Sequence, residues 1–304
     1  MNGATAVDIS AAVASQRRSS PNPITTSAAV SSHDAAAAMD LLGSPTTQYP
    51  PDRSLFPGQD RSLAGIAARA FMLGAVLAAG MLLTTLLALL PVLLSADTVA
   101  LLAPLWRLPF FAAALAAFHF LEFYVTAAHN TPAASVDSFL LTANWPAYAI
   151  AHTAAFAECF VRLTVFRGSH LPGLAHLAPL WPARPLLLIG LVVVTIGQLV
   201  RSAAMTQAGR SFNHQIQRRR AHSHALVTTG IYAHLRHPSY FGFFWWALGT
   251  QLVLGNFVCF AAYAAVLWRF FSRRIRHEEQ LLIRFFGDDY VSYQKRVGTK
   301  MPFI

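Results

Sequence analysis

The stretch FGFFWWALGTQLVLGNFVCFAAYAAVLWRFF, residues 241–271, decides the fold because it is apolar along almost its whole length. A helix needs about 20 apolar residues to cross the hydrocarbon core of a bilayer. This run is too long for one comfortable span, and Gly255-Asn256 interrupts it near the middle. It therefore predicts two short transmembrane helices that form a hairpin.

Four further apolar segments precede the hairpin and have the length expected of membrane spans. They run from Phe71 to Leu94, Phe110 to Ala127, Tyr148 to Val165 and Leu186 to Met205. The chain is 55% hydrophobic and 12% charged, with a mean hydropathy of +0.45, which favours a membrane protein over two soluble domains. The predicted fold is an all-α polytopic transmembrane helix bundle of about six spans.

The chain divides into three regions. Residues 1–60 are rich in Ala, Ser, Thr and Pro and show no sustained apolar period, so they predict a disordered cytoplasmic tail without a signal peptide. Residues 61–206 contain the N-terminal transmembrane helices. Residues 207–304 contain a basic loop, the transmembrane hairpin and C-terminal cytoplasmic helices.

The positions of the basic residues predict the orientation, because Lys and Arg are enriched in cytoplasmic loops. The loop from Gln207 to Arg236 and the tail from Arg273 onward are both basic, so both should face the cytoplasm with the N-terminus. Arg167 and Arg184 would then face the lumen, against this rule. Loops beside anionic lipid explain the formal charge of +10, and a nucleic-acid partner is not expected.

Several ionisable residues lie inside the predicted spans, where an unpaired charge is costly. Glu158 and Arg162 are four residues apart, so they predict either a neutralised structural pair or the lining of an access path for an amphiphilic substrate. His119, Glu122 and His152 show no metal-ligand spacing, which favours hydrogen bonds between helices. The two cysteines indicate neither a disulfide framework nor a zinc site.

Polar motifs flank the hairpin on both sides. Pro238, in the motif before it, suits the first turn of a helix, and the free N–H groups of such a turn attract an anionic ligand group. Arg274 and Glu278, after the hairpin, are four residues apart and reach the same side of a helix. These two side chains could form an exposed ion pair instead of a site.

The ordered set H-x-L-V-T-x-G-x-Y, R-H-P-S-Y-x-G, an apolar hairpin, R-x-x-x-E-E and F-G-x-x-Y spans residues 224–290. This order resembles the integral-membrane isoprenylcysteine carboxyl methyltransferases. The resemblance extends upstream through Arg201-Ser-Ala-Ala-Met, Ala208-Gly209 and Phe212-Asn-His214, and faintly to Asp137-Ser-Phe-Leu-Leu141. It implies methyl esterification, by S-adenosylmethionine, of the C-terminal prenylated cysteine carboxylate of CaaX-processed proteins.

The resemblance also implies particular site residues and makes residues 207–304 the catalytic region. It places Arg274 beside the substrate carboxylate and implies no metal. The residues it implies for S-adenosylmethionine are Gln217, His224, Ala225, Leu226, Val227, Tyr232, His237, Pro238, Ser239, Tyr240 and Glu278. Tyr232 and Tyr240 could present their rings to the sulfonium or the adenine.

The resemblance further implies the endoplasmic reticulum membrane as the location, with the active site facing the cytoplasm. The partners it implies are prenylated protein C-termini, such as those of Ras-like GTPases and prenylated peptide pheromones, together with the lipid bilayer. The chain departs from the family pattern at Thr142-Ala-Asn-Trp-Pro-Ala-Tyr148, which bears on the choice of lipid substrate. A sterol reductase that uses NADPH, a phospholipid methyltransferase and a non-catalytic membrane scaffold remain alternatives.

Overall fold

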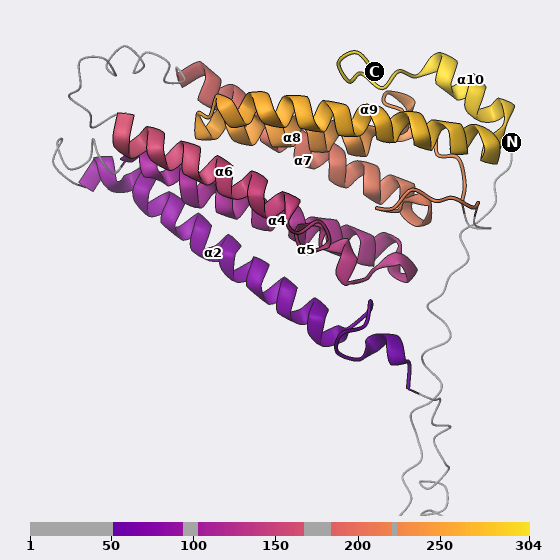
Figure 1. Cartoon of the computed structure of the whole chain (residues 1–304), viewed down its shortest axis with the longest axis horizontal. Helices are drawn as coiled ribbons and strands as arrows, with labels where there is room; N and C mark the ends of the chain where they lie inside the picture. The colour runs from indigo at the N-terminus through magenta and orange to yellow at the C-terminus, as the bar shows by residue number, and fades with distance from the viewer. Residues whose placement is uncertain (1–50, 94–102, 167–183, 221–223) are drawn as a thin grey trace, which may run out of the picture. The chain divides into compact units, whose positions relative to one another are not determined.

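The computed structural model describes residues 51–93, 103–166, 184–220 and 224–304 (Figure 1). These residues form helices and turns, and they contain no strand. The α-helices are α2 (Leu63–Leu93), α4 (Arg107–His129), α5 (Leu140–Ala143), α6 (Ala147–Val161), α7 (Arg184–Ala208), α8 (Pro238–Leu254), α9 (Val258–Phe286) and α10 (Asp288–Arg296). A π-helical turn, Arg162–Phe166, extends α6, and short 3-10 turns connect several of the other helices.

Every predicted apolar segment is helical, and the run from Phe241 to Phe271 divides at Gly255 into α8 and α9 as expected. Among the described residues, three helical segments are long and apolar enough to cross a membrane: 63–89, 104–129 and 185–211. The chain is therefore a helical membrane protein. Residues 1–50 of the predicted disordered tail lie outside the described residues. The last residues of that predicted tail belong to the folded unit, which begins at Asp52, and the backbone of Asp60 accepts a hydrogen bond from Val136 N at 2.8 Å.

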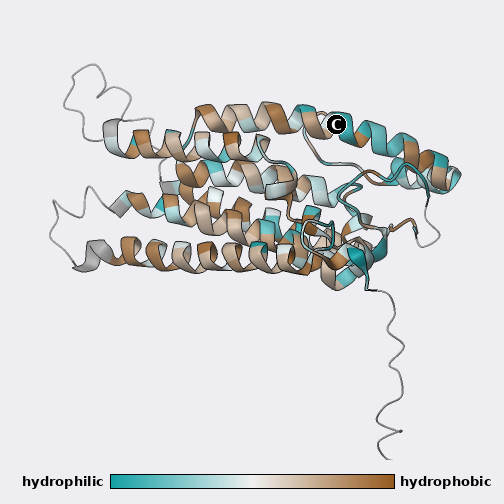
Figure 2. Cartoon of the chain, turned by 60° about the horizontal axis from the view of Figure 1, so that its bottom comes forward, coloured by the Kyte–Doolittle hydropathy of each residue, from teal (hydrophilic) through white to brown (hydrophobic). Residues whose placement is uncertain are grey.

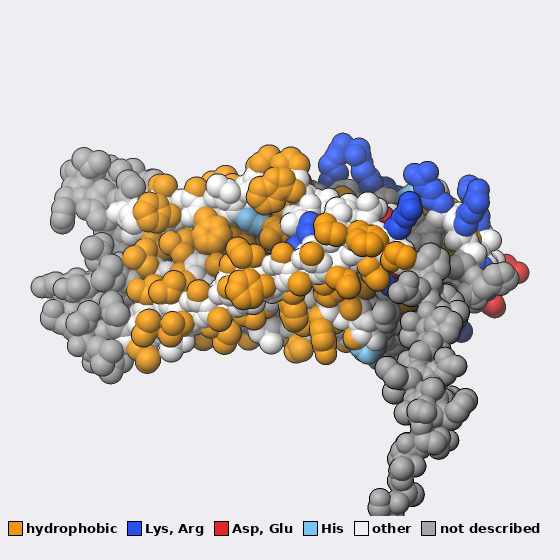
Figure 3. Space-filling view, turned by 90° about the horizontal axis from the view of Figure 1, so that it is seen from below, with side chains coloured by type: hydrophobic (Ala, Val, Ile, Leu, Met, Phe, Trp, Pro, Cys, Tyr) orange, Lys and Arg blue, Asp and Glu red, His pale blue; other side chains and the backbone are white. Residues whose placement is uncertain are grey.

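Hydrophobic residues recur along most of the length of these helices (Figure 2), and many of the large ones are exposed. In α2, Phe71, Met72, Met81 and Leu82 are each at least 60% exposed, as expected of side chains that face lipid. Lys and Arg side chains gather toward one end of the helices, and apolar side chains cover the rest of the face that Figure 3 shows. This separation is the one that a membrane imposes.

Helices α7 and α8 pack against each other with backbones in contact. A Cβ atom added at Gly197 would lie 2.6 Å from Trp246 N, and one added at Gly242 would lie 2.6 Å from Gly197 O. Small residues allow such close approach in membranes, where van der Waals contact replaces the hydrophobic effect between helices. Any larger residue at these two positions would push α8, and the polar motif at its start, away from α7.

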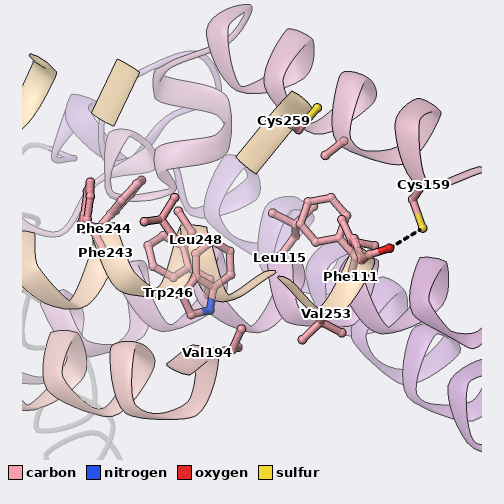
Figure 4. Packing of buried hydrophobic residues seen from close by; sticks show 14 of the residues in the cluster. Phe111, Leu115, Cys159, Val194, Phe243, Phe244, Trp246, Leu248, Val253 and Cys259 are labelled. Carbon is pink, nitrogen blue, oxygen red and sulfur yellow. Dashed lines mark hydrogen bonds between the residues drawn. The ribbon is translucent and has the colours of Figure 1, made fainter. Parts of the chain in front are cut away.

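The interior between α4, α6, α8 and α9 is filled largely by aromatic and aliphatic side chains, among them Phe111, Phe243 and Trp246 (Figure 4). Trp246 packs on Phe118 with ring centroids 4.2 Å apart. At the opposite end of this core, Cys159 Sγ donates to the carbonyl oxygen of Leu254 at 3.4 Å (Figure 4). The thiol therefore has a packing role, in agreement with the predicted absence of a disulfide among the described residues.

Glu158 stabilises the start of α9. Its Oε1 accepts hydrogen bonds from Phe257 N at 2.6 Å and Val258 N at 2.9 Å, and its Oε2 accepts one from Cys259 N at 2.7 Å. These N–H groups have no partner within the helix, and an anion there also interacts favourably with the helix dipole. Glu158 thus has a structural role, through the backbone of another helix, while Arg162 packs over the Phe257 ring at 4.5 Å.

Replacing Glu158 with Gln should lower the thermal midpoint of the protein in detergent. The neutral amide has one acceptor oxygen where the carboxylate has two, and losing such a cap costs about 0.5–2 kcal/mol. Asp137→Asn is the matched control, because Asp137 is an exposed carboxylate whose oxygens accept no hydrogen bond among the described residues. Equal midpoints for the two variants would show that the Glu158 contacts contribute nothing to stability.

The carboxylate of Glu279 links the C-terminal segment to the residues at the start of α8. Oε1 of Glu279 accepts from Arg236 Nε at 2.8 Å and lies 3.1 Å from His237 Nε2, while its Oε2 accepts from Gln294 Nε2 at 2.8 Å. Arg236 Nη1 also donates to the carbonyl oxygen of Val297 at 2.7 Å. Burial alone would raise the pKa of Glu279, but its hydrogen bonds and the charges of His237 and Arg236 lower that pKa to about 2.

This lowered pKa predicts a pH-dependent contribution to stability. The contribution is fully present above the unfolded-state pKa of about 4.3 and is lost as the pH falls toward 2. Between these two pH values the carboxylate binds a proton in the unfolded chain but not in the folded one, so acid favours unfolding. The difference in thermal midpoint between the wild type and Glu279→Gln should therefore be large at pH 6 and shrink by pH 3. Parallel curves for the two proteins across this range would contradict the assignment.

Candidate functional site

A cavity with an empty volume of about 680 Å³, part of it open to solvent, lies between the loop before α8 and the polar half of α9. Leu226, Leu282 and Phe286 form an apolar wall, whereas Asn213, Ser239 and Glu278 supply polar groups. The cavity can therefore hold a molecule with both an apolar and a charged part.

A chain of hydrogen bonds leads from the cavity to Arg274. The hydroxyl of Tyr240 donates to Glu278 Oε2 at 2.6 Å and accepts from Arg274 Nε at 2.8 Å. Arg274 Nη2 donates to the carbonyl oxygen of His214 at 2.5 Å, and among the described residues nothing accepts from Nη1. Tyr240 thus separates Arg274 from Glu278, so the simple exposed ion pair is wrong, and Arg274 keeps a donor for a further anion.

A buried ion pair next to these hydrogen bonds links three helices. Glu122 of α4 and Arg201 of α7 pair through both carboxylate oxygens, with side chains 1% and 5% exposed. Arg201 Nη1 also donates to the backbone oxygen of Ser239 at 3.1 Å and to its Oγ at 2.9 Å. Because Ser239 is the second residue of α8, the pair fixes the first turn of that helix.

The loop before α8 is shaped by hydrogen bonds to α7. Gln207 Oε1 accepts from Ile231 N at 2.9 Å, and the Tyr232 hydroxyl donates to the Ala204 carbonyl at 3.2 Å. Gly230 adopts a φ of +53°, a conformation that favours glycine, and a Cβ there would displace the Gln207 amide, which lies 2.0 Å from that position. The ring of Tyr232 is left to line the cavity while its hydroxyl is fixed.

Burial shifts the titration of the groups around the cavity. It raises the pKa of Tyr232 and, together with the nearby Arg220 charge, lowers the pKa of His224. Burial also lowers the pKa of His214, although Glu122 acts in the opposite direction. Both imidazoles are therefore neutral at physiological pH, and Glu278 is the acidic residue in the cavity wall.

The structure brings together most of the residues singled out from the sequence. Ten of the eleven line the cavity: His224, Ala225, Leu226, Val227, Tyr232, His237, Pro238, Ser239, Tyr240 and Glu278. Gln217 is not among the lining residues. Pro238 occupies the first turn of α8, as expected, and Arg274 lies one side chain behind the cavity wall.

Other lining residues were missed, including Asn213, Arg236, Tyr290 and Tyr293. Tyr290 is the one with an unsatisfied group, because its hydroxyl is buried without a hydrogen-bond partner. Its place in the F-G-x-x-Y motif was the available signal, but that motif was not assigned a contact. Arg201 was likewise noted only as part of a motif, because nothing in sequence spacing pairs it with Glu122.

The predicted hydrogen bonding of the three polar residues within the spans holds in part. Glu122 pairs between helices as described above, and His152 Nδ1 lies 3.5 Å from the Tyr263 hydroxyl. For His119 the prediction is wrong, since neither ring nitrogen has a partner. In the part of the chain that the structure describes, no group of three or more His, Cys, Asp or Glu side chains is arranged to hold a metal.

Comparisons with known proteins identify the family of the chain. Residues 188–284 match the model of the isoprenylcysteine carboxyl methyltransferase (ICMT) family. A Saccharomyces cerevisiae relative, protein-S-isoprenylcysteine O-methyltransferase, is 43% identical over 194 residues, which cover 64% of this chain and 79% of that protein. The human relative of the same name is 42% identical over 190 residues, which cover 62% of this chain and 63% of the human protein.

A solved structure of the eukaryotic intramembrane Ras methyltransferase ICMT, without a monobody, is also similar. The two folds match with a TM-score of 0.65 and 36% sequence identity, over 79% of this chain and 77% of that one. Sequence similarity therefore covers more than 60% of this chain and structural similarity covers 79% of it. The chain belongs to the isoprenylcysteine carboxyl methyltransferase family.

Proposed function

We propose that this chain transfers a methyl group from S-adenosylmethionine to the C-terminal carboxylate of a prenylated cysteine. The observation that carries the proposal is the continuous path from the cavity through Glu278 and Tyr240 to Arg274. It places an anionic group at the cavity and a cationic one just beyond it. A cationic methyl donor and an anionic acceptor need these two charges on opposite sides of the reacting atoms.

The residues that line the cavity fit the chemistry of the cofactor. Bound S-adenosylmethionine would supply an electrophilic methyl group attached to a positively charged sulfur. Glu278 and the Tyr240 ring would attract that positive charge, and the apolar wall of Leu226, Leu282 and Phe286 suits a flat heterocycle. His224 Nδ1 is buried at the cavity without a partner, so it has a hydrogen-bonding position left for a ligand.

The acceptor carboxylate needs no general base, because a C-terminal carboxyl with a pKa near 3.5 is ionised at neutral pH. What the protein contributes is position. Arg274 is held by Tyr240 and by the His214 carbonyl, so its guanidinium is oriented before the acceptor arrives. Fixing two reactants in line can lower a barrier by about 7–11 kcal/mol. No residue then has to exchange a proton during the transfer.

The membrane follows from the acceptor, whose prenyl chain is soluble in lipid while its carboxylate meets a cofactor from the cytosol. We infer six crossings, with α8 and α9 as a hairpin, and a cavity that faces the cytoplasm of an endoplasmic reticulum membrane. The segments 207–236 and 273–304 are basic and both supply residues that line the cavity, which supports this orientation. Thiol-reactive labels at residue 217 and at the C-terminus should react from the cytoplasm, and luminal reactivity of the first would overturn the model.

In this setting the acceptors are prenylated protein C-termini, including those of Ras-like GTPases and prenylated peptide pheromones. The comparisons do not favour a sterol reductase or a phospholipid methyltransferase. The purified protein should therefore bind S-adenosylhomocysteine and not NADPH, and it should form a base-labile methyl ester on N-acetyl-S-farnesylcysteine. Binding of NADPH without methylation would contradict the proposal.

Substitutions of Arg274 test its role in that reaction. Arg274→Lys should slow methylation although it keeps the charge, because lysine lacks the planar donor fork that fits a carboxylate, and Arg274→Ala should slow it further, by about 100-fold or more. Affinity for S-adenosylhomocysteine should survive both changes, whereas Glu278→Gln should lose that affinity first. Near-normal turnover of Arg274→Ala would remove Arg274 from the acceptor site.

A further inference from the structure

His119 of α4 is completely buried, yet neither of its ring nitrogens has a hydrogen-bond partner among the described residues. A buried polar group without a partner loses its hydration and gains nothing in return. In native proteins such groups are few, and each calls for an explanation such as a ligand or a bound water. The position of His119 therefore indicates a binding partner that the chain itself does not supply.

Two side chains from the start of α6 surround this imidazole. The ring of Tyr148 lies 5.4 Å from that of His119, edge to face, and the ring of His152 lies 6.0 Å away. His152 Nε2 is also buried without a partner. Helices α4 and α6 thus place three polar rings side by side, and two of these rings carry buried nitrogens without a partner.

This cluster borders the reaction centre on its membrane side. His119 precedes Glu122 by three residues, so it lies about one helical turn away. The Tyr148 ring lies 6.5 Å from the Phe243 ring, and the Arg201 guanidinium lies over that same ring at 5.1 Å, which places Tyr148 close to the ion pair. Neither His119 nor Tyr148 lines the cavity. The ion pair therefore lies between these two rings and the proposed cofactor.

Resting on the proposed function, we propose that His119 and Tyr148 hydrogen-bond the amide of the prenylcysteine acceptor and so determine which carboxylates are methylated. A prenylcysteine presents its lipid chain, its amide and its carboxylate within a few bonds of one another. Arg274 matches the carboxylate, and the apolar interior matches the lipid. A neutral imidazole offers one donor and one acceptor, and a phenol offers both, which matches the C=O and N–H of an amide.

Two acceptors separate this proposal from a general effect on activity. N-acetyl-S-farnesylcysteine carries the amide, whereas S-farnesylthiopropionic acid has the same lipid, thioether and carboxylate but no acylamino group. The wild type should prefer the first acceptor, and His119→Leu and Tyr148→Phe should each reduce the ratio of kcat/KM values by about tenfold, the factor for one hydrogen bond. The loss should appear in KM for the amide acceptor, with affinity for S-adenosylhomocysteine retained.

Stability and a conservative variant distinguish a specificity role from a structural one. His119→Leu removes an unpaired imidazole, so the thermal midpoint without acceptor should stay the same or rise, and His119→Gln should restore part of the preference. Tyr124→Phe is the matched control, because Tyr124 lies on α4 with a side chain 56% exposed, and it should leave the ratio unchanged. A lowered midpoint together with equal losses on both acceptors would overturn the proposal.

The outcomes also separate this proposal from the function on which it rests. If the wild type methylates neither acceptor, the proposed function fails and this inference fails with it. If the wild type methylates both and the His119 and Tyr148 variants keep the same ratio, the function stands and the assignment of these two residues is wrong.

Discussion

The buried pair of Glu122 and Arg201 is the interaction on which the rest of the site depends. A charge inside a membrane protein is tolerated when it is paired, and breaking such a pair by removing one partner costs about 3–5 kcal/mol. Here the pair joins α4 to α7, and Arg201 continues to Ser239 at the start of α8. Charge neutralisation therefore determines where the polar motif before α8 is held.

Close packing of α7 against α8 makes this geometry possible. Gly197 and Gly242 bring the two backbones into contact, which places Arg201 beside the first turn of α8. Tyr240, in the same turn, then reaches both Glu278 and Arg274 on α9. Three interactions thus connect the apolar interior to the cavity: the Glu122–Arg201 pair, the contact between the α7 and α8 backbones, and the hydrogen bonds of the Tyr240 hydroxyl. A lipid-soluble acceptor and a water-soluble cofactor can meet at such a boundary without a channel for bulk water.

The sequence predicted the structural features that depend on residues close together in the chain. Hydropathy located α2, α4, α6, α7, α8 and α9, Gly255 marked the division between the last two, and Pro238 marked a helix start, because these features depend on neighbours in the chain. Hydropathy did not locate the short α5 or the polar α10. Of the eleven residues that the motifs assign to the cofactor, ten line one cavity. Gln217 is not among the lining residues, and residues 52–60, which composition alone assigned to a tail, belong to the folded unit through contacts such as that of Asp60 with Val136.

What could not be predicted depends on pairs that are distant in sequence. Glu122 and Arg201 are 79 residues apart, and Glu158 meets the backbone of α9 about 100 residues later. No periodicity or spacing identifies such partners. The unpaired state of His119 is harder still to foresee, because residue type alone predicts that a buried histidine is satisfied.

Hydrogen–deuterium exchange of the full chain in lipid nanodiscs, with and without S-adenosylhomocysteine, tests the central claim most directly. The account predicts slower exchange on cofactor binding within residues 224–240 and 278–293, which form the cavity wall, and no change within residues 63–89 of α2. Protection that is absent from both cavity segments, or that lies in α2 instead, would contradict the account.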